Sequence, residues 1–166
     1  TQDELEGMFI ENSDEPYAYE IAKMIMKERR KKKIETTLEL KNIVEKAVLQ
    51  SKDVKNMSNR DKDETVKKSC ARVFQALRID VNNEFEVLYE FLEKLPSVLA
   101  PQGKAVILTF HSGEDRLVKK SFKSLKNAGV YQEIARDVIR PKREECHRNP
   151  RAKSTKMRWA VKNLKF

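Results

Sequence analysis

AVILTFHSGEDR, residues 105–116, is the stretch that decides the fold. Residues 105–110 form an apolar run of strand length that follows a Pro101-Gln102-Gly103 turn. From Glu114 onward the sequence is charged, with apolar residues at helical spacing. The stretch therefore predicts a strand, a polar loop and a helix, and open α/β sheets bind their ligands at such strand ends.

The segments on either side predict further helices and strands. Upstream, residues 14–50 predict two helices, the second opened by a capping box of Thr36 and Glu39, and residues 51–63 are polar without a period, which predicts a mobile loop. Two more helices follow, with apolar residues at helical spacing between Val66 and Leu95. Downstream, the helix can end at Gly129, and two strands joined by a basic loop are predicted at 131–139 and 157–164.

Charge is concentrated in two places. The formal net charge is +9, and residues 136–165 alone hold eleven Lys or Arg against three acids. Residues 27–33 hold six basic residues and one acid. Both clusters suit a phosphate backbone, although residues 27–33 can equally be a solvated helix end whose cations complement the helix dipole.

Composition limits the class of protein. The 166 residues are 39% hydrophobic, and no apolar run reaches the length of a membrane span. Cys70 and Cys146 give no disulfide framework, so we expect a cytoplasmic location, or an organelle if a targeting segment precedes the chain. Cys146 and His147 are adjacent but lack a second ligand pair, so no metal site is expected.

Five motifs together resemble the MraW/RsmH methyltransferase family. They are VFQALRI at 73–79, Asn82 with Glu84, LAPQGK at 99–104, FHSGEDR at 110–116 and NPRAKSTKMR at 149–158. The resemblance implies S-adenosylmethionine-dependent methylation of N4 of a cytidine in the decoding region of small-subunit (16S) rRNA. Two departures stand out, because the family commonly has His-Pro-Ala-Thr-Arg where this chain has residues 68–72, and Leu where it has Gly113.

The same resemblance implies an α/β fold and a division of the chain. Residues 10–70 are expected to be a helical insertion subdomain, and residues 71–166 the C-terminal part of a class I (Rossmann-like) methyltransferase sheet that ends in an antiparallel strand pair. The four glycines lie too far apart to form the glycine-rich loop that holds the cofactor in such enzymes. We therefore expect the S-adenosylmethionine site in an N-terminal half that this chain lacks.

Candidate site residues follow from the motifs. His111, Ser112 and Asp115 are expected to line the catalytic cleft, although His111 can equally bond the loop's own backbone and Asp115 can simply start the helix. Residues expected to contact RNA supply cations for phosphate and amides for sugars or base edges. They are Arg72, Gln75, Arg78, Asn82, Arg116, Arg148, Asn149, Arg151, Lys153 and Lys156.

The expected partners are small-subunit rRNA or the ribosomal subunit, the missing N-terminal half and no membrane. Because the strand at 105–110 would expose an edge without that half, a homo-oligomer is also possible. Trp159 alternates with charged neighbours in its strand and is expected in the core, although an exposed face could instead stack a base. The alternative to an enzyme is a non-enzymatic RNA-binding or ribosome-associated module.

Overall fold

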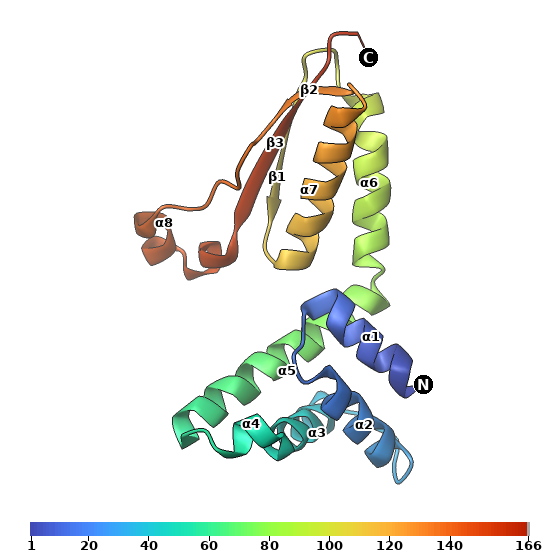
Figure 1. Cartoon of the computed structure of the whole chain (residues 1–166), viewed down its shortest axis with the longest axis vertical. Coiled ribbons are helices and arrows are strands. Elements are labelled where there is room, and N and C mark those ends of the chain that lie inside the picture. Colours follow the sequence, from blue (N-terminus) through green and yellow to red (C-terminus); the bar gives the residue numbers. More distant parts are fainter. Residues whose placement is uncertain (166) are drawn as a thin grey trace. The chain divides into compact units, whose positions relative to one another are not determined.

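The computed structural model describes residues 1–165, which divide into two compact units after Asn82. We call residues 1–82 the helical unit and the residues from Asn83 onward the sheet unit. Figure 1 shows the helical unit in blue to green and the sheet unit in light green to red. The chain is thus an α/β protein in which the described strands all lie in the sheet unit, where they alternate with helices.

Five helices make up the helical unit. Their bounds are α1 Gln2–Ser13, α2 Ala18–Arg29, α3 Thr37–Gln50, α4 Lys52–Lys55 and α5 Asn59–Val81. Phe9, Ile21, Val44, Val48 and Val73 are fully buried between them and form the centre of this unit's core. Cys70 belongs to the same core.

Capping boxes begin two of these helices. The Thr36 hydroxyl accepts a hydrogen bond from the Glu39 N–H at 3.1 Å, and the Glu39 carboxylate accepts one from the Thr36 N–H at 3.0 Å, as predicted. The same reciprocal pair joins Thr1 and Glu4 at the start of α1, a helix that was not predicted. Each box satisfies backbone donors that have no partner within the helix.

Residues 51–63 are largely helical, so the prediction of a loop was wrong. Val54 in α4 is fully buried, and the Ser58 hydroxyl caps α5 by accepting from the Asp61 N–H at 3.3 Å. One buried valine and a cap therefore order a segment whose composition is almost entirely polar. The unit boundary also differs from the expected 70/71, because α5 runs through that position and buries Ser69, Cys70 and Val73 in the helical unit.

The sheet unit packs helices against one face of a three-stranded sheet. Its elements are α6 Glu84–Val98, β1 Lys104–Thr109, α7 Ser112–Asn127, β2 Tyr131–Ile134, α8 Arg143–Arg148, η1 Pro150–Ser154 and β3 Lys156–Lys162. The strand order is β1-β3-β2 with both pairs antiparallel, which confirms that the last two strands pair. The basic loop between them forms the short helices α8 and η1 rather than an irregular connection (Figure 1).

The core of the sheet unit lies between the sheet and α7. Val118 and Phe122 of α7 are buried with Leu92 of α6 and with Ala160 of β3. As predicted, α7 ends at Gly129, whose φ of 79° needs no Cβ, and the Val130 N–H returns to the Leu125 carbonyl at 2.9 Å. The chain reverses direction at this turn and continues into β2.

The other face of the sheet is only partly covered by the described residues. Val106 and Leu108 of β1 are more than half exposed, and Trp159 of β3 is half-buried on the same face. The prediction that Trp159 belongs to the core was therefore wrong, because alternation along β3 turns Arg158 and Ala160 toward α7 instead. None of the helices in the described part of the chain is long and apolar enough to span a membrane.

Candidate functional site

The loop after β1 is shaped by a reciprocal cap. His111 is the N-cap of α7, and its Nδ1 accepts from the Glu114 N–H at 3.5 Å. The Glu114 carboxylate in turn accepts from the Phe110 N–H at 2.8 Å. The histidine therefore takes the place that Ser or Thr holds in a standard capping box, and this fixes the turn at the strand end.

His111 is enclosed by its neighbours. Its side chain is 14% exposed, its Nε2 lies 3.5 Å from the Glu114 carboxylate, and its ring centroid lies 5.9 Å from that of Phe85. A Cβ at Gly113 would lie 2.4 Å from the Phe85 ring, so Phe85 fills the space that a side chain at position 113 would take. The structural role left open for His111 by the sequence is thus present in the molecule.

Asp115 is buried in an ion pair. Its two carboxylate oxygens accept from Arg158 of β3, from Nε at 2.7 Å and Nη2 at 3.1 Å. Burial by itself would raise the pKa of Asp115, but the hydrogen bond and charge of Arg158, with the charge of Lys156, outweigh it and lower that pKa. Asp115 is therefore ionised near neutral pH and joins the start of α7 to β3.

The remaining predicted residues of this group lie around the start of α7. Lys156, predicted to bind RNA, lies with Nζ 3.6 Å from the Asp115 carboxylate and is 17% exposed. Ser112 and Arg116 are exposed in the first turns of α7. The structure thus brings His111, Ser112, Asp115, Arg116 and Lys156 together at one end of the sheet.

A second group of predicted residues follows α8. We call residues 140–154 the basic segment, and Arg148, Asn149, Arg151 and Lys153 within it are exposed. The Asn149 Oδ1 accepts from the Arg151 N–H at 3.2 Å and caps η1, with Pro150 in its first turn. In the described part of the chain no ion pair holds Arg148, Arg151 or Lys153, so their charges face solvent.

The other predicted RNA contacts lie in the helical unit. Arg72 lies 3.9 Å from the buried Glu15 carboxylate, and Gln75 donates to the Asn12 carbonyl at 3.5 Å. Both therefore help to hold α5 against the start of the chain. Arg78 is exposed near the end of α5, and Asn82 caps that helix.

Three contributors to the site were missed from the sequence: Arg158, Glu114 as a cap, and Phe85. The spacing of His111 and Glu114 matches the Ser/Thr-x-x-Glu cap pattern, so this signal was available if histidine is admitted as the cap. Burial of Arg158 carried no such signal. Among residues 1–165 no group of three or more His, Cys, Asp or Glu side chains is arranged to hold a metal ion.

A comparison of the whole sequence with known protein families gives a match over nearly all of the chain. Residues 1–163 match the model of the MraW methylase family. The chain belongs to the MraW methylase family. This confirms the resemblance drawn from the five motifs, and the match spans both the helical unit and the sheet unit.

Curated relatives carry a common description. The chain is 59% identical over 163 residues to "Ribosomal RNA small subunit methyltransferase H 1" of Lachnoclostridium phytofermentans, covering 98% of this chain and 43% of that protein. It is 56% identical to the protein of the same description in Agathobacter rectalis, with 98% and 45% covered. The chain thus spans less than half the length of these curated relatives.

Proposed function

We propose that this member of the MraW methylase family is part of an S-adenosylmethionine-dependent methyltransferase that acts on small-subunit rRNA. The observation that carries the proposal is the identity of 59% over 163 residues to a relative described as a small-subunit rRNA methyltransferase. The proposed methyl acceptor is N4 of a cytidine in the decoding region. We further propose that the sheet unit is the end of a class I methyltransferase sheet and that the helical unit is inserted into that sheet.

The chemistry requires positioning more than reactive groups. The cytosine amine is a weak nucleophile because its lone pair is delocalised into the ring, so an enzyme must orient it and accept its hydrogen bonds. Reaching the amine favours a single-stranded or flipped base. In this proposal the end of β1 supplies one wall of the cleft, with His111 and Ser112 facing the base.

Asp115 acts in this proposal as a positioning residue. Both its oxygens are bonded to Arg158, and its lowered pKa makes it a poor base. It keeps the first turn of α7 at a fixed place relative to β3, and through it His111 and Ser112. Arg116, exposed one residue further on, is placed to meet a phosphate.

The basic segment is the proposed contact to the RNA backbone. Arg148, Arg151 and Lys153 are exposed, and no ion pair in the described part of the chain neutralises them. Cations in this state can release counterions from RNA when they bind phosphate, which is the main source of sequence-independent affinity. The rigid turn at Asn149 and Pro150 holds them on one short segment.

The surroundings of the four glycines bear on where S-adenosylmethionine binds. The strand-to-helix turn at Gly113 is filled by the Phe85 ring, and the other three glycines lie outside any turn that joins a strand to a helix. We therefore propose that the cofactor is held by residues outside these 166 positions.

The test is methyl transfer by the entire product of the gene. Labelled S-adenosylmethionine and small-subunit rRNA are incubated with the protein, and the RNA is digested to nucleosides. We expect label in N4-methylcytidine and no binding of S-adenosylmethionine to the 166-residue chain by calorimetry. RNA binding without any methyl transfer would support the alternative, a non-enzymatic RNA-binding module, which the exposed cations of the basic segment favour.

A further inference from the structure

A hollow of about 310 Å³ lies in the helical unit, where α2 ends and α3 begins. Four lysines stand around it, together with two glutamates, an asparagine and two isoleucines. The lining is Glu28, Lys31, Lys32, Lys33, Ile34, Glu39, Asn42, Ile43 and Lys46. Its size falls at the lower end of sites that hold small molecules, and it can accept a group as large as one nucleotide.

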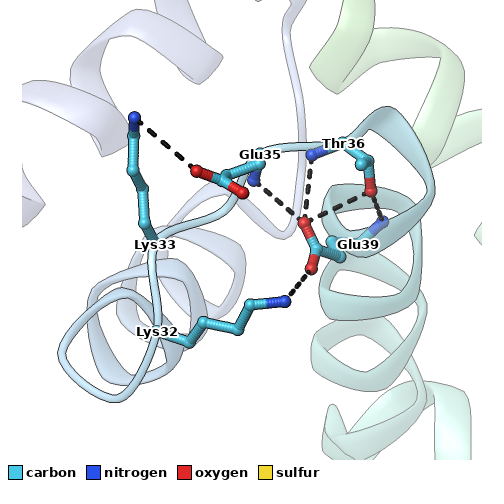
Figure 2. Close-up of polar contacts among 5 residues, drawn as sticks. All are labelled: Lys32, Lys33, Glu35, Thr36 and Glu39. Carbon is cyan, nitrogen blue, oxygen red and sulfur yellow. Dashed lines mark hydrogen bonds and ion pairs between the residues drawn. The ribbon is translucent and has the colours of Figure 1, made fainter.

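The lysines at the rim are held by carboxylates of the same corner. Lys32 Nζ lies 2.7 Å from Glu39, and Lys33 Nζ lies 3.8 Å from Glu35, as Figure 2 shows. Lys31 and Lys46 share Glu28 at 3.0 and 3.8 Å. These contacts hold the ammonium groups around the opening.

Cations outnumber acids at the rim. The lining has four lysines and two glutamates, and the exposed Lys27, Arg29 and Arg30 lie just before it in the chain. The side chains of Lys31, Lys32 and Lys33 are 60%, 74% and 83% exposed. Exposed ion pairs of this kind contribute little free energy, so a phosphate can replace the carboxylate partners at low cost.

The interior of the hollow differs from its rim. Ile34 and Ile43 are half-buried and pack on the core of the helical unit, so they offer apolar surface to whatever enters. Asn42 is exposed beside them and carries an amide that can both donate and accept hydrogen bonds. Apolar surface, one amide and a ring of ammonium groups match an unstacked base with its flanking phosphates.

We propose that this corner of α2 and α3 binds one nucleotide of a single-stranded RNA, with the base in the hollow and the neighbouring phosphates on Lys31, Lys32 and Lys33. The proposal rests on the proposed function for the identity of the RNA, but the contact itself does not require methyl transfer. An acidic peptide would satisfy the lysines, yet it would leave the apolar interior without a planar group to cover it. The site is separate in sequence from the basic segment of the sheet unit.

The first test separates these lysines from charge in general. The triple variant K31Q/K32Q/K33Q is compared with K52Q/K55Q/K67Q, which removes three exposed lysines from the same unit. Binding of a labelled single-stranded RNA of about 15 nucleotides is followed by fluorescence anisotropy at several salt concentrations. We expect the first variant to lose about tenfold or more in affinity, and its salt slope to fall by about 2, because each lost phosphate contact removes about 0.7 from the slope for a single strand.

The second test probes shape without changing charge. Asn42→Trp fills the hollow from an exposed position on α3, and Asn42→Ala serves as its control. We expect N42W to weaken RNA binding while the salt slope stays that of the unsubstituted chain. Equal affinities of N42W and N42A would overturn the placement of a base in the hollow.

The outcomes also separate this inference from the proposed function. Equal losses in the two lysine variants, or no RNA binding by the unsubstituted chain, would overturn the inference even if the entire gene product methylates rRNA. A selective loss in K31Q/K32Q/K33Q would support it even if methyl transfer were absent. Far-UV circular dichroism of each variant confirms that the helices are intact.

Discussion

Glu15 in the helical unit and Asp115 in the sheet unit are both buried carboxylates, but their partners differ. Glu15 accepts from the Ser69 hydroxyl at 2.8 Å and the Tyr17 N–H at 3.1 Å, with the Arg72 guanidinium more distant at 3.9 Å. Asp115 has two short bonds from the guanidinium of Arg158. The helical unit thus relies on neutral donors and the sheet unit on a cation.

Two predicted site residues, Arg72 and Asp115, take part in these contacts. Arg72 was expected to bind RNA, and it lies beside a buried carboxylate that already has two neutral donors. Asp115 was expected to line a cleft, and its oxygens are occupied by a residue 43 positions away. A buried ion pair loses more when one partner is removed than a neutral hydrogen bond does, so the two units should respond differently to substitution.

The largest effect is expected for Arg158→Met. It removes both hydrogen bonds of the buried Asp115 to Arg158 and leaves only the more distant Lys156 ammonium at 3.6 Å, so it should lower the free energy of unfolding of the sheet unit by about 3 kcal/mol. Trp159, the single tryptophan of the chain, lies in the sheet unit and reports its unfolding in urea by fluorescence. The double variant D115L/R158M should regain much of the loss, and an R158M variant as stable as the parent chain would disprove the importance of the pair.

A smaller effect is expected for Ser69→Ala in the helical unit. The substitution removes one neutral donor from Glu15 and should cost about 1–3 kcal/mol. Arg72→Met should cost less, because its 3.9 Å contact is long and its side chain is 39% exposed. Unfolding followed by circular dichroism at 222 nm measures both. A greater loss in R72M than in S69A would reverse the comparison drawn between the two units.

The cap of α3 should contribute less still. Thr36→Ala removes the hydroxyl that accepts from the Glu39 N–H and should cost about 1 kcal/mol. Thr37→Ala, the next residue and also exposed, provides the matched control because no cap bond depends on it. If both variants lose the same stability, the capping box is not what begins α3.

The smallest effect is expected at low pH, where protonation of Glu39 weakens the capping box of α3. The hydrogen bond from Lys32, followed by those from the N–H groups of Glu35 and Thr36, lowers the pKa of Glu39 to about 2. Because the pKa of Glu39 is lower in the folded state, the ionised carboxylate stabilises the fold fully above its unfolded-state pKa of about 4.3. This stabilisation is lost as the pH falls toward 2. The protection factors of the amides at the start of α3, which correct for the intrinsic pH dependence of exchange, should therefore fall across that window, and Glu39→Gln should remove this change.

The sequence predicted those parts of the fold that depend on local patterns. The Thr36 box, the end of α7 at Gly129 and the pairing of the last two strands all follow from short-range rules. Thr1 and Glu4 have the same capping-box spacing at the start of α1, a helix that the sequence analysis did not predict. The prediction of a loop at residues 51–63 was wrong because burial of the single Val54 outweighs the polar composition of the segment.

The loop after β1 was predicted as a strand end that opens a helix, but the contacts of its residues were not predicted. The loop after β1 was identified from the strand and the motif, whereas the partner of Asp115 lies on a strand whose two faces the sequence could not tell apart. Alternation along β3 allowed either Trp159 or Arg158 to face the helices, and the larger apolar residue was the natural choice. Only tertiary packing, with Ala105 and Ala160 paired beneath α7, decides for Arg158.

We propose that the sheet unit presents its basic segment to small-subunit rRNA. The most direct measurement compares R148Q/R151Q/K153Q with K119Q/K120Q/K123Q, three exposed lysines of α7, in the entire gene product. Transfer of labelled methyl groups to cytidine in small-subunit rRNA gives KM and kcat for each. We expect KM for the RNA to rise in R148Q/R151Q/K153Q but not in K119Q/K120Q/K123Q, while kcat changes little. An unchanged KM in R148Q/R151Q/K153Q, or no methyl transfer by the unsubstituted protein, would contradict this proposal.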